Sequence, residues 1–195
     1  MKRDIKWALD LAHSEIAFKI RHLMITNVRG SFKTFDASIY TTSNDFTSAK
    51  IGFWIDASSI STGDVKRDEH LKSDEFFDAH NYKQLSFTAD TIGKVDENGE
   101  HQLWGELTMK GVTKNIMLTV LFGGLLEDPW GNERAGFTVS GSLSRSEWGL
   151  VWNSPLQNGG LMVSDEVNIT CKIQLVRIDE TNLKMKLESE VEEIY

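Results

Sequence analysis

Apolar residues alternate with other residues along most of this chain, and that alternation is what most restricts its fold. The clearest run is Val167, Ile169, Cys171, Ile173 and Leu175, in which every second residue is apolar. Alternation over four to eight residues is typical of a half-buried β-strand, because successive side chains point to opposite faces. Similar runs lie near residues 16–20, 51–55, 85–89, 103–109 and 137–143. Many such runs separated by turn signals predict an all-β protein, either an antiparallel sandwich or a barrel.

Two features favour the barrel. Glycines lie within the strand patterns, where tightly bent strands need them, at Gly30, Gly52, Gly105, Gly136 and Gly141. Residues 116–122 are apolar on both faces, as expected where the inner face of a strand lines a cavity and the outer face is covered. With only two prolines in the chain, strand pairing is hardly interrupted.

One charged segment, from Arg67 to Asp78, interrupts the strand patterns. It is compatible with a helix and closes on two adjacent aromatic residues, Phe76 and Phe77. An all-β domain rarely contains such a segment unless the segment covers an opening, such as the open end of a barrel. We therefore expect a helical or irregular excursion over the open end of a barrel, and hence a ligand cavity beneath it.

Composition excludes several classes of partner. The chain has 195 residues and a formal net charge of -8, whereas nucleic-acid binding and docking on anionic lipid by charge both need a basic patch. Cys171 is the only cysteine, so no intrachain disulfide forms, and its place in an apolar run predicts a buried, inert thiol. No apolar run is long enough to span a membrane, and the first residues lack the apolar core of a signal peptide. These features predict a cytoplasmic protein without stable membrane insertion, with a processed periplasmic form as the alternative.

The C-terminal residues 178–195 differ from the rest. They are rich in acids, and Leu183, Leu187, Val191 and Ile194 recur at helical spacing. One interpretation is a disordered tail, and the other is a helix docked on the barrel or on a second subunit, which would make a homodimer. We therefore divide the chain into a barrel domain, residues 1–177, and an acidic C-terminal helix or tail, residues 178–195.

Nine short motifs in order resemble the YceI-like family, the lipocalin-like polyisoprenoid-binding proteins. They are Trp7–Asp10, His13–Phe18, His22–Met24, Val28–Phe32, Arg67–Leu71, Ser73–Asp78, Gly105–Thr113, Ser144–Gly149 and Gly159–Val167. The chain departs from the family at Lys83 and Asn115, where proline is usual. The acidic tail lies outside the resemblance.

The resemblance implies an eight-stranded antiparallel lipocalin-like barrel that holds one long-chain amphiphile, of the polyisoprenoid or fatty-amide type. Carriage, storage and sensing all remain open as its purpose, and no cofactor is implied. Eight strands enclose room for about one small ligand. Ten phenylalanines, six tryptophans and six methionines could supply broad apolar walls.

Aromatic residues of the strand patterns and of the excursion are the candidates for the lining of the cavity. They are Phe18, Phe32, Phe53, Phe76, Phe77, Phe87, Trp104, Phe137 and Trp148. Trp54 is a further candidate, but period-two alternation places Phe53 and Trp54 on opposite faces, so at most one of the two lines the cavity. At the mouth, Arg67 and His70 are the candidates for contact with a polar or pyrophosphate headgroup.

Two other functions stay open. An enzyme acting on a lipid-like substrate could use His70 with Asp68 or Asp74 as acid and base. A protein-interaction barrel could use the acidic tail as its adaptor. The five histidines and the single cysteine show no spacing typical of a metal site.

Overall fold

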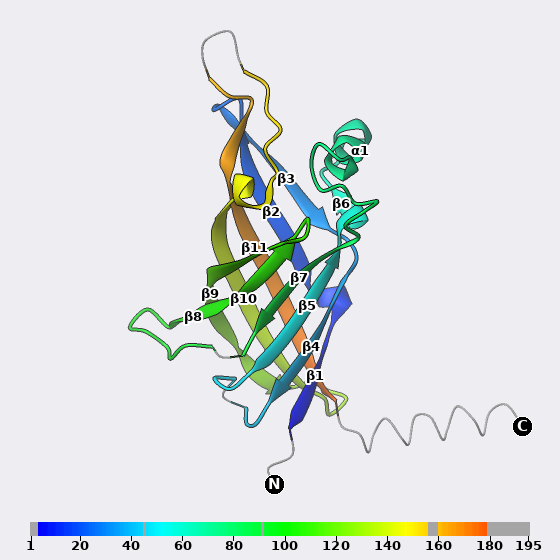
Figure 1. Cartoon of the computed structure of the whole chain (residues 1–195). Helices are drawn as coiled ribbons and strands as arrows, with labels where there is room; N and C mark the ends of the chain where they lie inside the picture. The colour runs from blue at the N-terminus through cyan, green and yellow to red at the C-terminus, as the bar shows by residue number, and fades with distance from the viewer. Residues whose placement is uncertain (1–3, 45, 91, 156–159, 179–195) are drawn as a thin grey trace, which may run out of the picture.

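The computed structural model describes residues 4–44, 46–90, 92–155 and 160–178 (Figure 1). The elements, in chain order, are β1 (Ile5–Leu9), η1 (Leu11–His13), β2 (Glu15–His22), β3 (Thr26–Phe32), β4 (Phe35–Thr41), β5 (Lys50–Asp56), η2 (Ala57–Ser59), β6 (Ile60–Ser61), α1 (Val65–Lys72), β7 (Gln84–Ala89), β8 (Glu100–Met109), β9 (Val112–Glu127), β10 (Glu133–Ser144), η3 (Arg145–Trp148) and β11 (Val163–Ile178). The predicted acidic helix or tail lies outside the described residues, apart from Ile178 at the end of β11. No helix within the described ranges has the length and apolar character that crossing a membrane requires.

Eight strands close into a barrel in the order β1, β4, β5, β7, β8, β9, β10 and β11. The ring closes because β11 pairs with β1, with Trp7 opposite Arg177. All of the pairings are antiparallel. The predicted all-β, eight-stranded antiparallel barrel is therefore confirmed.

The wall is extended at one end by β2, β3 and β6. One part of β11 pairs with β2, where Ile169 lies opposite Phe18, and the last residues of β11 pair with β1. The chain thus passes from β1 to β2 through the short turn of η1 while it stays beside β11. These extra strands lengthen the barrel towards the end where α1 lies (Figure 1).

The charged excursion begins as a helix two residues earlier than predicted. Asp64 caps α1 by accepting a hydrogen bond from the backbone N–H of Arg67 at 3.0 Å, which satisfies one of the free donors of the first turn. The helix ends at Lys72, and turns carry the chain on to Phe76 and Phe77. Lys110 Nζ donates to the carbonyl oxygen of Asp74 at 3.0 Å, which ties the excursion to the turn between β8 and β9.

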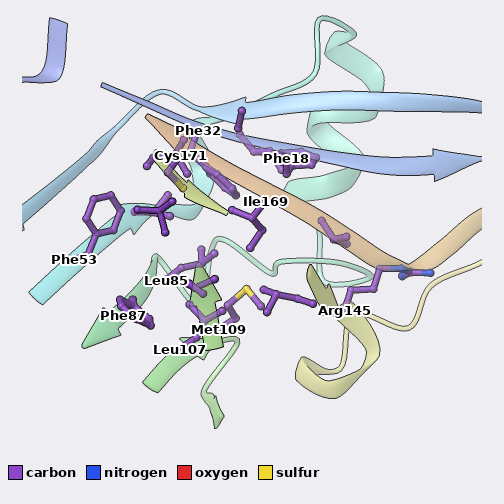
Figure 2. Close-up of a pocket in the computed structure, with 18 of the residues that line it drawn as sticks. Phe18, Phe32, Phe53, Leu85, Phe87, Leu107, Met109, Arg145, Ile169 and Cys171 are labelled. Atoms are coloured by element: carbon purple, nitrogen blue, oxygen red, sulfur yellow. The ribbon is translucent and has the colours of Figure 1, made fainter. Parts of the chain in front are cut away.

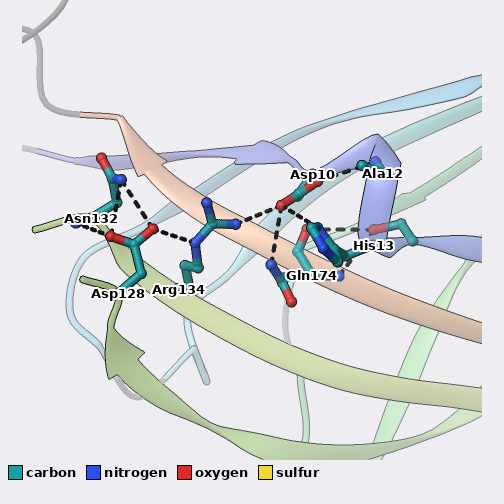
Figure 3. Close-up of polar contacts among 8 residues, drawn as sticks. Asp10, Ala12, His13, Asp128, Asn132, Arg134 and Gln174 are labelled. Atoms are coloured by element: carbon teal, nitrogen blue, oxygen red, sulfur yellow. Dashed lines mark hydrogen bonds and ion pairs between the residues drawn. The ribbon is translucent and has the colours of Figure 1, made fainter. Parts of the chain in front are cut away.

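A polar network joins the β1–β2 junction to the β9–β10 turn (Figure 3). Arg134 lies between two carboxylates, with Nη1 2.5 Å from Asp10 Oδ2 and Nε 2.6 Å from Asp128 Oδ2. Asn132 donates to Asp128, and Gln174 Nε2 donates to Asp10 at 3.1 Å. Burial raises the pKa of Asp128, but the hydrogen bonds from Arg134 and Asn132 outweigh burial and hold that pKa well below its ordinary value. The network holds the scaffold together and lies apart from the cavity.

Candidate functional site

The barrel holds a cavity of about 580 Å³, part of whose lining is drawn in Figure 2. This volume is within the range of roughly 300–1,000 Å³ that is typical of ligand pockets. Aliphatic and aromatic side chains from most strands of the wall line it, among them Ile169 of β11, Leu107 of β8 and Met109 at the end of β8. The cavity can therefore take an apolar chain without leaving polar wall groups unpaired.

Nine of the eleven predicted site residues lie on this cavity. The aromatic ones are Phe18, Phe32, Phe53, Phe76, Phe77, Phe87 and Phe137, and the polar ones are Arg67 and His70. Phe53 lines the cavity and its neighbour Trp54 does not, as the alternation in β5 requires.

Trp104 and Trp148 do not line the cavity, so their prediction as lining residues was wrong. Trp104 is 60% exposed on the outer face of β8, directly opposite Met117 of β9. Trp148 is fully packed in η3, and its Nε1 donates to the carbonyl oxygen of Leu107 at 3.1 Å. Trp148 supports the wall from behind instead of facing the lumen.

Two glycines leave room for aromatic rings of the cavity to pack against the backbone of the barrel wall. A Cβ atom on Gly30 would lie 2.3 Å from Cζ of Phe18, which is directly opposite on β2. A Cβ atom on Gly105 would lie 2.4 Å from Cζ of Phe87. Both distances are shorter than real contacts allow, so each ring occupies space that only glycine leaves free. The rings therefore lie closer to the wall than any larger residue would permit.

The end of the cavity beside α1 carries its basic side chains. Lys66 and Arg67 come from the first turns of α1, and His22 comes from the end of β2. Arg67 is held in place by Thr62, since its Nε donates to Thr62 Oγ1 at 2.7 Å and its Nη2 to the Thr62 carbonyl at 3.1 Å. Lys66 is exposed and also lines the cavity, so the cavity reaches the protein surface at this end.

A further basic group, Arg145 at the start of η3, also lines the cavity although sequence reasoning did not select it. Arg145 is only 6% exposed. Its Nε donates to the carbonyl of Ser164 at 2.9 Å and its Nη1 to the carbonyl of Leu150, both neutral acceptors. Burial lowers the pKa of this guanidinium, while the more distant carboxylate of Asp165 acts in the opposite direction. Within the described part of the chain, Arg145 forms no ion pair.

His70 does not form the acid–base pair that an enzyme was expected to use. Its Nε2 is 2.6 Å from Glu75 Oε2, and its ring packs edge-on against Phe76 and Trp152. Asp68 instead accepts hydrogen bonds from the backbone N–H and the hydroxyl of Thr62, at 2.8 and 2.5 Å. These contacts fit a histidine that fixes the excursion over the barrel end. In the ranges that the structure describes, no group of three or more His, Cys, Asp or Glu side chains is placed to hold a metal ion.

Other lining residues missed at the sequence level are Phe46, in the β4–β5 turn, and Trp152, after η3. Neither lies in an alternating run, so no periodic signal marks them. Cys171 was predicted to be a buried thiol, and its side chain in fact faces the cavity. Burial raises the pKa of that thiol to about 12, with a smaller contribution from the charge of Glu15.

Comparison with known proteins places this architecture in a family. The family model described as the YceI-like domain matches residues 7–175. The UPF0312 protein of Staphylococcus epidermidis is 38% identical over 163 residues, which cover 83% of this chain and 92% of that protein.

Solved structures agree with this result. The Campylobacter jejuni YCEI protein superposes with a TM-score of 0.69 at 33% identity, over 87% of this chain and 96% of that one. A polyisoprenoid binding domain from Saccharophagus degradans, implicated in plant cell wall breakdown, has a TM-score of 0.63 at 15% identity, over 88% and 98% of the two chains, and so shares the fold. The match over nearly the whole barrel, the relatives above 30% identity and the common fold show that this chain belongs to the YceI-like family.

Proposed function

We propose that this protein binds one long-chain amphiphile, with the apolar tail in the barrel and an anionic headgroup at the end beside α1. The observation that carries the proposal is the cavity of about 580 Å³ with apolar walls and basic groups gathered at one end. The fold shared with a polyisoprenoid binding domain supports a lipid-like ligand, of the polyisoprenoid or another long-chain class. Such a protein could carry, store or sense its ligand.

The apolar wall supplies enough free energy for tight binding. Each methylene removed from water contributes about 0.8 kcal/mol, so a tail of about a dozen carbons gains on the order of 10 kcal/mol. Ordering the tail and the lining side chains opposes this gain by several kcal/mol. A micromolar or lower dissociation constant remains after that loss.

The charges at the mouth favour an anionic headgroup. Lys66, Arg67 and Arg145 line the cavity, and no Asp or Glu in the described ranges lines it with them. A guanidinium buried as deeply as Arg145 without a counter-ion is unfavourable, because burial removes its hydration. A carboxylate or phosphate in the cavity would provide the missing charge and accept hydrogen bonds from the cationic groups.

Native mass spectrometry of the purified protein, followed by extraction of the bound molecule, tests the binding itself. We expect a bound lipid mass in the wild type and its loss in Ile169→Trp, because the indole would fill the middle of the cavity. Thr170→Trp is the matched control, since Thr170 is the next residue of β11 and is exposed. Empty wild-type protein, both as purified and after incubation with fatty acids, would contradict the proposal.

The headgroup is tested with two probes of equal chain length, a fatty acid and the corresponding fatty alcohol. The wild type should bind the fatty acid more tightly than the alcohol at neutral pH. Lys66→Ala should reduce that preference without lowering the affinity for the alcohol. Lys114→Ala is a control that removes an exposed lysine of β9, which does not line the cavity. Equal affinity of the wild type for the two probes would contradict the anionic headgroup.

A further inference from the structure

The cavity is closed at the end opposite α1 by a cluster of aromatic rings centred on Phe46. The ring of Phe46 is 4.9 Å from that of Trp7, 4.9 Å from that of Phe137 and 6.0 Å from that of Phe122, measured between centroids. Phe46 is only 4% exposed. A tail that enters beside α1 and fills the barrel therefore ends against these rings.

A second, smaller space lies behind Phe46. It has a volume of about 30 Å³, and Phe46 lines both this space and the main cavity. Ile92, Val120 and Phe137 line both as well, so together with Phe46 they form the partition between the two spaces. Of the four, Ile92 takes part in an isolated bridge, and Val120 and Phe137 belong to the paired strands β9 and β10.

Phe46 differs from the rest of the partition because it comes from the turn between β4 and β5. Its backbone has φ of +57°, a left-handed conformation that is unusual and strained for a bulky residue. The Phe46 carbonyl accepts one hydrogen bond, from the N–H of Ala49 at 3.0 Å, which closes the turn. The ring can thus be removed or changed without unpairing any strand of the barrel.

From these observations we infer that Phe46 is the residue that sets the longest tail the cavity accepts. The inference rests on the proposed function and extends it, because it names the residue that determines chain-length specificity. Binding should tighten as the tail grows until the chain end meets the Phe46 ring, and further carbons should then add nothing. Removing the ring joins the two spaces and lets longer tails bury additional methylenes.

The experiment measures dissociation constants of the delipidated full chain for straight-chain saturated fatty acids of increasing length. In the wild type, each added carbon should tighten binding about fourfold, equivalent to about 0.8 kcal/mol, up to a plateau. Phe46→Gly should move the plateau to longer chains and continue the fourfold steps beyond the wild-type limit. Glycine is chosen because it accepts a φ of +57° without strain, which protects the fold of the turn.

A matched pair of milder variants guards against loss of folding. Phe46→Leu should shift the plateau in the same direction by a smaller amount. Phe35→Leu is its control, since Phe35 is also buried, at 6% exposed, and lines neither space. Circular dichroism and thermal unfolding establish that each variant keeps the barrel.

The outcomes separate the inference from the proposed function. Wild-type protein that binds no fatty acid of any length overturns both. If the wild type shows a plateau and neither Phe46 variant moves it, the inference about Phe46 is overturned but the proposed function is not. An equal shift in Phe35→Leu also overturns it, because a general loosening of the core would then explain the change.

Discussion

Gly30→Ala tests whether the cavity owes its width to glycines beneath the luminal rings. The new Cβ would lie 2.3 Å from Cζ and 2.7 Å from Cε1 of Phe18, and 2.9 Å from Cγ2 of Thr62. Ordinary contact begins at 3.4 Å, so the edge of the Phe18 ring must move by about 1 Å. Phe18 lines the cavity, so we expect the displaced ring to move into the space that a ligand tail would use.

We expect two measurable effects. Overpacking of this kind typically costs about 1–3 kcal/mol of unfolding free energy. If the displaced ring excludes one methylene of the tail, the dissociation constant for a fatty acid rises about fourfold. Urea unfolding measures the first effect, and isothermal titration with a fatty acid that fills the cavity measures the second.

Substitutions at two further glycines separate the effect of contact with a ring from other effects of alanine. In Gly105→Ala the new Cβ would meet Phe87 and would also lie 2.5 Å from the backbone oxygen of Thr88, which cannot turn away as a ring can. Gly105→Ala should therefore lose more stability than Gly30→Ala. In Gly52→Ala the nearest atom is 3.9 Å away, so this control should keep wild-type binding and gain about 0.4–1 kcal/mol of stability.

If Gly30→Ala keeps full stability and binds fatty acids as tightly as the wild type, the Phe18 ring does not depend on the glycine. An equal loss of binding in Gly52→Ala would also contradict the prediction. In that case alanine would act through the bend or twist of the strands and not through contact with a ring.

Three more predictions follow from other parts of the molecule. Burial raises the pKa of the Cys171 thiol to about 12, so the thiol should react with a disulfide reagent at pH 8 at least about tenfold more slowly in native protein than in urea. Equal rates in the two states would contradict its placement. Because the folded pKa of Asp128 is depressed, its stabilising effect is complete above about pH 4 and is lost as the pH falls through the folded pKa. Asp128→Asn should thus lower the melting temperature at pH 7 and flatten its decline in acid, whereas a parallel shift at every pH would contradict this. If the apolar stripe of residues 178–195 pairs two subunits, sedimentation of the full chain should show a weak dimer whose association strengthens with salt. The dimer should be absent when the chain ends at Arg177, and monomer masses for both chains would exclude it.

The strand pattern predicted an all-β fold and favoured a barrel because alternation follows from backbone geometry, whereas the number of strands came from the resemblance to the YceI-like family. Alternation in β5 correctly separated Phe53 from Trp54. The same rule could have excluded Trp104, which shares its side of β8 with Gln102 and Glu106, all of them exposed. The error came from the residue type, since an aromatic side chain was given more weight than its position in the alternation.

Contacts between distant segments could not be predicted in the same way. The space for the Phe18 ring is set by Gly30 on the neighbouring strand, and the sequence shows no signal for which glycine meets which ring. Trp148 reaches the carbonyl of Leu107 across a separation of 41 residues. Such contacts depend on strand register, which becomes known only when the barrel is closed.

The missed residues Phe46 and Arg145 lie at opposite ends of the barrel, where paired strands give way to turns. Alternation directs a side chain only while the backbone is extended, and at Phe46 the direction is instead set by a φ of +57°. Arg145 is directed by the carbonyl of Leu150, five residues further along the chain, and by that of Ser164 near the start of β11. The strand pattern thus places most of the lining side chains, whereas turn residues supply Phe46, the proposed limit on tail length, and Arg145, a basic group of the cavity. On the proposed function, relatives with the same alternation would differ in ligand through these turns, because the residues proposed to select chain length and headgroup lie where the period-two signal ends.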